Sequence, residues 1–166
     1  KSEDIDQADI LFVNTCTIRE NADDKLYGTL GHLKKWKDQS SDRRLIVGGC
    51  AAQKDKELVR DRAPWVDVVI GTHNTNDVIN LLNQSEDWGP ITKIVEETLD
   101  IETEILPVRE SGFSAFVTIQ IGCNNSCTFC IVPSVRGVEI SRRPSDIINE
   151  IKNLSNEGVK EITLLG

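Results

Sequence analysis

The fold is decided by residues 10–22, which read ILFVNTCTIRENA and set a short apolar run directly before a helix start. The run from Ile10 to Val13 is typical of a buried strand, and Thr17 with Glu20 matches the capping box of a helix N-terminus. Apolar side chains then recur at steps of four, four and three, on one helix face: Ala22, Leu26, Leu30 and Leu33. The segment is therefore predicted to be a strand followed by a helix.

The same alternation continues along the chain. Strands are predicted at Leu45–Val47 and Val66–Ile70, and helices at residues 53–62 and Asp77–Leu82. Strand–helix repeats of this length predict an α/β domain with a parallel sheet over residues 1–84.

The helical period is then lost. Residues 85–104 carry one basic and seven acidic side chains, and Pro90 and Pro107 interrupt the surrounding sequence. Residues 85–112 are therefore interpreted as an acidic linker, with one strand near Ile91–Val95.

Residues 113–166 form a second predicted unit. Residues 113–121 alternate like a strand, a polar loop follows, Pro144 opens a helix that ends near Gly158, and Ile162–Leu165 is a last strand. Two strands and one helix close neither a sheet nor a barrel, so this unit is expected to be incomplete.

Composition and charge exclude several classes of protein. The chain has 166 residues, 39% hydrophobic content and a net charge of −8. It is therefore not mostly disordered, and no apolar run approaches the roughly 20 residues of a membrane helix. Most of the excess negative charge lies in the linker, so the rest lacks the basic surface of a free-standing nucleic-acid binder. Opening on Lys1 and holding no Met are expected of an excerpt from a longer protein.

Three cysteines lie close together in the polar loop of the second unit. Cys123, Cys127 and Cys130 have the spacing C-x3-C-x2-C, and neither Cys nor His follows them. Three thiolates can hold an iron–sulfur cluster with one iron open for another ligand. A structural zinc site normally closes with four ligands, and three clustered cysteines cannot all pair in disulfides. Zinc, a disulfide and a chance spacing remain the alternatives at this point.

The other two cysteines follow predicted strands. Cys16 comes after the first strand and Cys50 after the second. The carboxyl ends of parallel strands share one edge, where ligands usually bind. Each cysteine alone is more often a small buried hydrophobic residue than a ligand, and that alternative stays open.

The loop at residues 122–137 reads GCNNSCTFCIVPSVRG and stands between a predicted strand and a predicted helix. It resembles the cluster loop of the radical S-adenosylmethionine (SAM) superfamily. The resemblance implies a 4Fe–4S cluster on Cys123, Cys127 and Cys130, with SAM bound at the open iron and Phe129 close to the adenine. Arg136 is a candidate for a positive charge near the SAM carboxylate or the cluster, or is a surface residue on a turn.

Three further stretches, at residues 14–22, 49–53 and 65–74, together with this loop resemble the methylthiotransferase family. The resemblance implies an N-terminal α/β domain followed by the start of a radical SAM (β/α) partial barrel. It also implies a second 4Fe–4S cluster, for which Cys16 and Cys50 match two of three cysteine ligands. The remaining cysteine is expected upstream of Lys1.

For the whole protein, this resemblance implies that a methylthio group is inserted at C-2 of an isopentenylated adenosine beside the tRNA anticodon. The expected cofactors are two 4Fe–4S clusters and two SAM molecules. The tRNA anticodon stem-loop is expected to bind through a C-terminal domain absent here, and a flavodoxin or ferredoxin to donate electrons. A cytoplasmic enzyme with no membrane contact is expected, since clusters need a reducing compartment. A sibling enzyme acting on a ribosomal-protein aspartate or on threonylcarbamoyladenosine, and a non-catalytic iron–sulfur or zinc module, remain alternatives.

Weaker signals complete the set. Arg142 and Arg143 are either RNA phosphate contacts or solvated surface residues. Gly48 and Gly49 are interpreted as a tight turn that lets the backbone approach a cluster, rather than as a phosphate cradle. His73 is interpreted as a helix-entry residue rather than a ligand.

Overall fold

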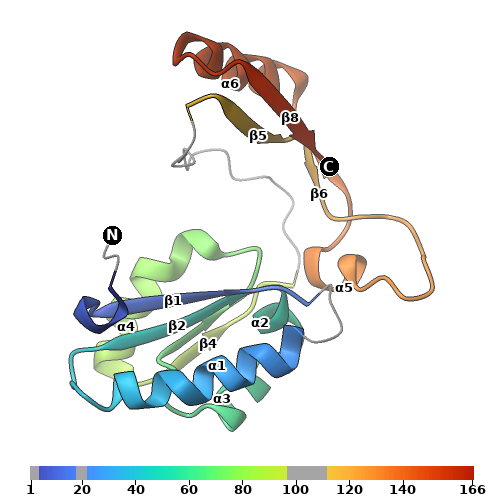
Figure 1. Ribbon diagram of the computed structural model, residues 1–166. Coiled ribbons are helices and arrows are strands. Elements are labelled where there is room, and N and C mark those ends of the chain that lie inside the picture. The colour runs from blue at the N-terminus through green and yellow to red at the C-terminus, as the bar shows by residue number, and fades with distance from the viewer. Residues whose placement is uncertain (1–3, 18–21, 97–111) are drawn as a thin grey trace.

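The computed structural model describes residues 4–17, 22–96 and 112–166 (Figure 1). The N-terminal unit is built on a four-stranded sheet in the order β1-β2-β3-β4, with every neighbouring pair parallel. Its strands are β1 (Ile10–Thr15), β2 (Arg44–Gly49), β3 (Val68–Ile70) and β4 (Ile91–Lys93). The predicted α/β fold with a parallel sheet is confirmed.

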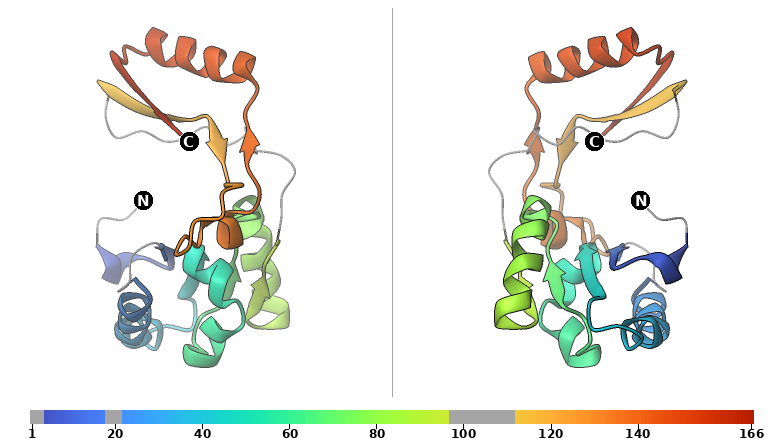
Figure 2. Two further views of the ribbon diagram at one scale, coloured as in Figure 1. Left: turned by 90° about the vertical axis from the view of Figure 1, so that its right-hand side faces the viewer. Right: turned by 90° about the vertical axis from the view of Figure 1, so that its left-hand side faces the viewer.

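Helices cover both faces of this sheet, as Figure 2 shows for α1 and α4 on opposite sides. The helices are η1 (Ile5–Gln7), α1 (Ala22–Lys37), α2 (Cys50–Asp55), α3 (Leu58–Arg62), η2 (Thr75–Asp77) and α4 (Val78–Trp88). The periodicity of the sequence fixes which side of α1 faces inward, because Leu26, Leu30 and Leu33 are all buried. The candidate capping box is only partly described, since Glu20 lies outside the described residues.

The side chains of β2 alternate between two cores. Leu45 and Val47 join the cluster under α1, whereas Ile46 joins the cluster under α4. Because both faces are covered, β2 reads as a continuous apolar run rather than as an alternating one. Its carboxyl end at Gly49 leads directly into α2, which begins at Cys50.

The N-terminal unit extends past the predicted boundary at residue 84. Helix α4 continues to Trp88, and β4 adds a fourth strand that pairs with β3. The predicted linker therefore begins too early. The acidic residues Glu86 and Asp87 near the end of α4 are exposed, so they hid the helical period without breaking the helix. The helix expected at residues 53–62 is also divided, into α2 and α3.

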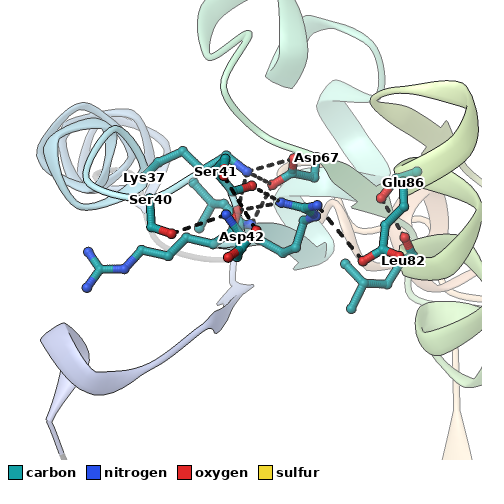
Figure 3. Close-up of polar contacts among 11 residues, drawn as sticks. Lys37, Ser40, Ser41, Asp42, Asp67, Leu82 and Glu86 are labelled. Atoms are coloured by element: carbon teal, nitrogen blue, oxygen red, sulfur yellow. Dashed lines mark hydrogen bonds and ion pairs between the residues drawn. The ribbon is translucent and has the colours of Figure 1, made fainter.

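The amino-terminal edge of the sheet is closed by polar contacts, which Figure 3 shows around Lys37 and Asp67. The Lys37 ammonium donates to Asp67 at 2.6 Å, and the backbone N–H of Leu45 donates to the same carboxylate at 2.7 Å. The end of α1 is thereby fastened to the starts of two strands. A longer ion pair of 3.9 Å joins Arg44 of β2 to Glu86 of α4.

The second unit is a strand–loop–helix–strand arrangement. Its elements are β5 (Ser114–Thr118), β6 (Gln120–Ile121), α5 (Val132–Arg136), β7 (Ile140–Ser141), α6 (Pro144–Asn156) and β8 (Glu161–Leu165). Strands β5 and β8 pair in parallel, and β6 pairs with β7 in an antiparallel ladder. The predicted strand over residues 113–121 is thus two strands, and α5 forms within the segment predicted as a polar loop.

Helix α6 covers one face of the β5–β8 pair. Leu154 packs with Ala115 and Val117, while Phe116, on the opposite face of β5, is 68% exposed. One covered and one uncovered face is the arrangement expected of the first strands of a (β/α) barrel. None of the helices in the described ranges is long and apolar enough to cross a bilayer.

Arg142 has a structural role in this unit. Its guanidinium donates to the Thr118 carbonyl at 2.8 Å and to the Glu150 carboxylate at 2.7 Å, so it joins the end of β5 to α6. The hypothesis that Arg142 contacts RNA phosphate is therefore not supported, because its charge is already paired. The backbone carbonyl of Arg143 accepts the N–H groups of Asp146 and Ile147 at the start of α6, and the proposed RNA contact of its side chain stays a prediction.

Candidate functional site

Cys16 and Cys50 lie at one edge of the sheet. Thr15 and Gly49 are direct partners in the β1–β2 ladder, Cys16 follows the first of them, and Cys50 follows the second as the opening residue of α2. Cys16 is exposed and Cys50 is 5% exposed. Their predicted placement at a shared carboxyl edge is confirmed, and their role as cluster ligands stays a prediction.

The side chain of Thr15 organises this edge. Its hydroxyl donates to the Gly48 carbonyl at 2.6 Å and accepts from the backbone N–H of Ala51 at 3.1 Å. Helix α2 has Gly49 at its N-cap, with no side chain to satisfy the first N–H groups. Thr15 supplies that cap from the neighbouring strand, and it thereby fixes the start of the helix that carries Cys50.

A side chain added at Gly48 or Gly49 would collide with a neighbouring group, and at Gly49 that group is backbone. A Cβ on Gly48 would lie 2.5 Å from the ring of Phe12, and a Cβ on Gly49 would lie 2.5 Å from the Thr15 carbonyl oxygen. Gly49 also has a φ of 96°, which favours glycine. These glycines therefore bring β1 against the start of α2, in keeping with the predicted tight turn.

A cavity of about 450 Å³ opens at this carboxyl edge. It is lined from the N-terminal unit by both cysteines and by the loop that follows β3, and from the second unit by the end of β6 and the end of α5. Its lining includes Cys16, Cys50, Thr72, His73, Ile121 and Arg136. The cavity therefore lies between the two units, where α5 is placed against α2 (Figure 1).

The loop with the three remaining cysteines is closed at its base. The backbone N–H of Cys123 donates to the Gly137 carbonyl at 3.1 Å. Gly122 has a φ of 74°, and a Cβ there would lie 2.0 Å from the carbonyl oxygen of Val138. Cys127 and Cys130 are exposed and share a turn in which the N–H of Cys130 donates to the carbonyl of Cys127 at 3.2 Å.

The donor set of this loop fits an iron–sulfur cluster. Residues 122–131 contain three thiols and no charged side chain, and all five cysteines of the chain are free of disulfides. The Asn125 amide lies 3.5 Å from the Cys123 sulfur, and such N–H donors tune cluster thiolates. Among the described residues, no three Cys, His, Asp or Glu side chains gather at single-ion spacing. A cluster takes each thiolate on a different iron, so it needs no such gathering.

The other two predicted site residues have different surroundings. Phe129 is 99% exposed on the loop and does not line the cavity, so its contact with adenine stays a prediction. Arg136 ends α5 and lines the cavity that Cys16 and Cys50 also line. Its positive charge therefore faces the side of the N-terminal cysteines.

Sequence reasoning missed three residues of this region. Thr15 and Thr72 are ordinary polar residues in sequence, and only the sheet register and the docked α5 reveal their contacts. Gln53 directly follows the apolar run Cys50–Ala52 in sequence, and the structure buries its amide together with that run. A buried amide on an apolar helix face requires hydrogen-bond partners and so indicates a structural or functional contact.

Comparisons with known proteins agree with this arrangement. Residues 1–71 match the family described as uncharacterized protein family UPF0004, and residues 117–166 match the radical SAM superfamily. A protein of Cutibacterium acnes named tRNA-2-methylthio-N(6)-dimethylallyladenosine synthase is 51% identical over 100% of this chain and 34% of its own length. A protein of the same name from Mycobacterium bovis is 49% identical over 100% of this chain and 33% of its own length. Another, from Rhodococcus jostii, is 50% identical over 95% of this chain and 32% of its own length. The chain spans about a third of the length of these relatives.

Proposed function

Because the chain joins a UPF0004 domain to the beginning of a radical SAM domain, we propose that the whole protein is a tRNA methylthiotransferase. Its substrate is the N-6-dimethylallyl (isopentenyl) adenosine beside the anticodon, and a methylthio group is inserted at C-2. Two 4Fe–4S clusters and two SAM molecules serve one reaction cycle. The names of relatives that share about half of the residues along the whole chain support this substrate.

The observation that carries the proposal is the cavity between the two units. Its lining contains Cys16 and Cys50 from the sheet edge and Arg136 from the helix that follows the cluster loop. A cavity of about 450 Å³ is of the size that holds a nucleoside or a small cofactor. Two expected ligands of the second cluster therefore line the same cavity as Arg136, the last residue of the helix that follows the cluster loop.

The chain's own residues have distinct roles in this scheme. When bound, a cluster with an open iron supplies the electron that cleaves SAM. Cys123, Cys127 and Cys130 hold that cluster, and Cys16 with Cys50 provides two ligands of the second. The guanidinium of Arg136 stabilises negative charge in the cavity, on a carboxylate or a cluster sulfur.

The partners follow from the chemistry and from the charge of the chain. With a net charge of −8, this chain provides little attraction for RNA phosphate, so the tRNA anticodon stem-loop binds mainly through other parts of the protein. A flavodoxin or ferredoxin supplies electrons. Thiolate-bound clusters persist in a reducing compartment, which places the enzyme in the cytoplasm.

The test uses the full-length protein, reconstituted anaerobically with iron and sulfide and given SAM, a reductant and tRNA bearing the dimethylallyl group. Mass spectrometry of the digested tRNA should show a methylthio adduct on the modified adenosine, and 5′-deoxyadenosine should accumulate. Parallel reactions supply tRNA bearing threonylcarbamoyladenosine or the ribosomal protein, and SAM cleavage with an adduct only in one of these would replace the substrate. Absence of SAM cleavage, or zinc in place of iron, would refute the enzyme in favour of a structural module.

A further inference from the structure

A hydrogen bond joins the N-terminal unit to the helix after the cluster loop. The hydroxyl of Thr72, just after β3, donates to the backbone carbonyl of Val135 in α5 at 2.8 Å. Val135 itself is 2% exposed, and α5 lies against α2. The bond therefore crosses the boundary between the two units at the wall of the cavity.

The position of Thr72 is fixed from the opposite side by Gln53. The Gln53 side chain is 2% exposed, and its Oε1 accepts the backbone N–H of Thr72 at 3.0 Å. Its Nε2 donates to the carbonyl of Val95 at 2.9 Å. A Cβ on Gly71 would lie 2.1 Å from Gln53 Oε1, so glycine at this position is what lets the amide reach Thr72. Gln53 belongs to α2, the helix that Cys50 opens.

The acceptor of the Thr72 hydroxyl is also near in sequence to the residue that closes the cluster loop. Two residues after Val135, the carbonyl of Gly137 accepts the N–H of Cys123 and closes the loop at 3.1 Å. Arg136 stands between these two carbonyls. Displacement of α5 would therefore move both Arg136 and the base of the loop relative to Cys50.

We propose that Thr72, held by Gln53, is a positioning residue that keeps the cluster loop and Arg136 in place against the cysteine edge of the sheet. The proposal rests on the proposed function, because it assigns a purpose to the alignment of two cluster sites. Thr72 touches no reacting atom in this scheme. It acts through the carbonyl of Val135 in α5, and it affects how tightly SAM cleavage is coupled to transfer of the methylthio group to the base.

The test compares two variants of the full-length protein. Thr72→Val keeps the shape of the side chain and removes the hydroxyl, whereas Thr72→Ser keeps the hydroxyl. Thr29→Val, on an exposed position of α1, is the matched control for the same chemical change. Hydrogen–deuterium exchange of the cofactor-free protein reports the stability of α5 without any activity.

We expect peptides over residues 131–137 to exchange about fivefold faster in Thr72→Val, as the loss of one neutral hydrogen bond predicts. Thr72→Ser should stay within about twofold of the wild type, and Thr29→Val should not differ from it. In the reconstituted enzyme, the ratio of 5′-deoxyadenosine to methylthiolated base should rise severalfold in Thr72→Val alone.

Unchanged exchange of residues 131–137 in Thr72→Val would overturn the proposal, as would equal effects of the valine and serine variants. Loss of exchange protection at the core residues Leu45–Val47 would show that Thr72→Val destabilises the whole unit. In that case Thr72→Ala is compared with Thr72→Ser, and equal protection of α5 in these two variants would overturn the proposal. The two proposals fail separately. If the wild type forms no methylthio product, the proposed function is refuted, and hydrogen–deuterium exchange still decides whether Thr72 holds α5. If Thr72→Val has a normal ratio of 5′-deoxyadenosine to methylthiolated base, only the positioning role is refuted.

Discussion

The two edges of the N-terminal sheet are finished in opposite ways. At the amino-terminal edge, Lys37 and Asp67 form an ion pair of 2.6 Å, and Asp67 also accepts the N–H of Leu45 (Figure 3). At the carboxyl-terminal edge, Cys16 and Cys50 face a cavity. One edge is occupied by polar groups that satisfy one another, and the other presents thiols and an opening.

This difference separates stability from chemistry within one small domain. The charges at the amino-terminal edge fasten α1 to the strands. At the opposite edge, Gly48 and Gly49 have no side chains to pack, and the Thr15 hydroxyl binds the backbone at the start of α2. The end of β1 and the start of α2 therefore lie close together beside the cysteines. Substitutions at the first edge should therefore change the free energy of unfolding alone, whereas those at the second should change metal binding and catalysis as well as stability.

The largest effect is expected from the cluster loop of the second unit, which lies beyond both edges. Cys127→Ala should abolish iron retention at this loop and reductive SAM cleavage in the full-length protein, because the cluster loses one of three thiolates. The melting temperature should hardly change, since Cys127 is exposed. Anaerobic 5′-deoxyadenosine assays check this, with Ser126→Ala as the neighbouring control. SAM cleavage that persists in Cys127→Ala would remove Cys127 from the ligand set.

Gly49→Ala should break the carboxyl edge itself. Its φ of 96° and the 2.5 Å approach to the Thr15 carbonyl leave no room for a Cβ. We expect the free energy of unfolding to fall by about 3 kcal/mol. Gly28→Ala, in α1 with no atom within 4 Å of the added methyl, should instead be neutral or stabilising. Equal denaturation midpoints for the two variants would contradict the proposed geometry.

Asp67→Ala should weaken the amino-terminal edge alone. It removes the acceptor of both Lys37 and the Leu45 N–H, and we expect the free energy of unfolding to fall by about 2 kcal/mol. SAM cleavage should match the wild type once the protein is folded. Urea denaturation measures the change, with the exposed Asp61→Ala as control. A specific loss of activity without loss of stability would show that the two edges are not independent.

Thr15→Val is the smallest of these changes. It removes the cap of α2 and should lower the free energy of unfolding by about 1 kcal/mol, while Thr15→Ser retains most of it. Because α2 begins with Cys50, iron retained in the N-terminal unit should fall as well. The iron content of Thr15→Val and Thr15→Ser is measured after the same reconstitution. Equal iron in the two variants would show that the Thr15 hydroxyl does not position Cys50.

The sequence was sufficient where a pattern is local. The strand ends before Cys16 and Cys50 followed from apolar runs, and the inward face of α1 followed from leucine spacing. The limit was long-range geometry. The strand predicted near Ile91–Val95 is present as β4, but no local pattern reveals that it pairs with β3. The short α5 is stabilised by its contact with α2 rather than by its own propensity.

The site shows the same division. The C-x3-C-x2-C spacing identified the loop cysteines without any structure, because the ligands are neighbours in sequence. The contacts of Thr15 and Thr72 depend on residues 33 or more positions away, at Gly48 and Val135. Only the folded arrangement brings these partners together.

The most direct test of the account is the iron content of the reconstituted full-length protein, compared with its Cys16→Ala/Cys50→Ala variant. Two separate cluster sites predict about eight irons per wild-type chain and about four in the variant, with SAM cleavage retained and methylthiolation lost. Equal iron in the two proteins would contradict the assignment of the carboxyl edge as a second cluster site and would leave Cys16 and Cys50 as structural residues.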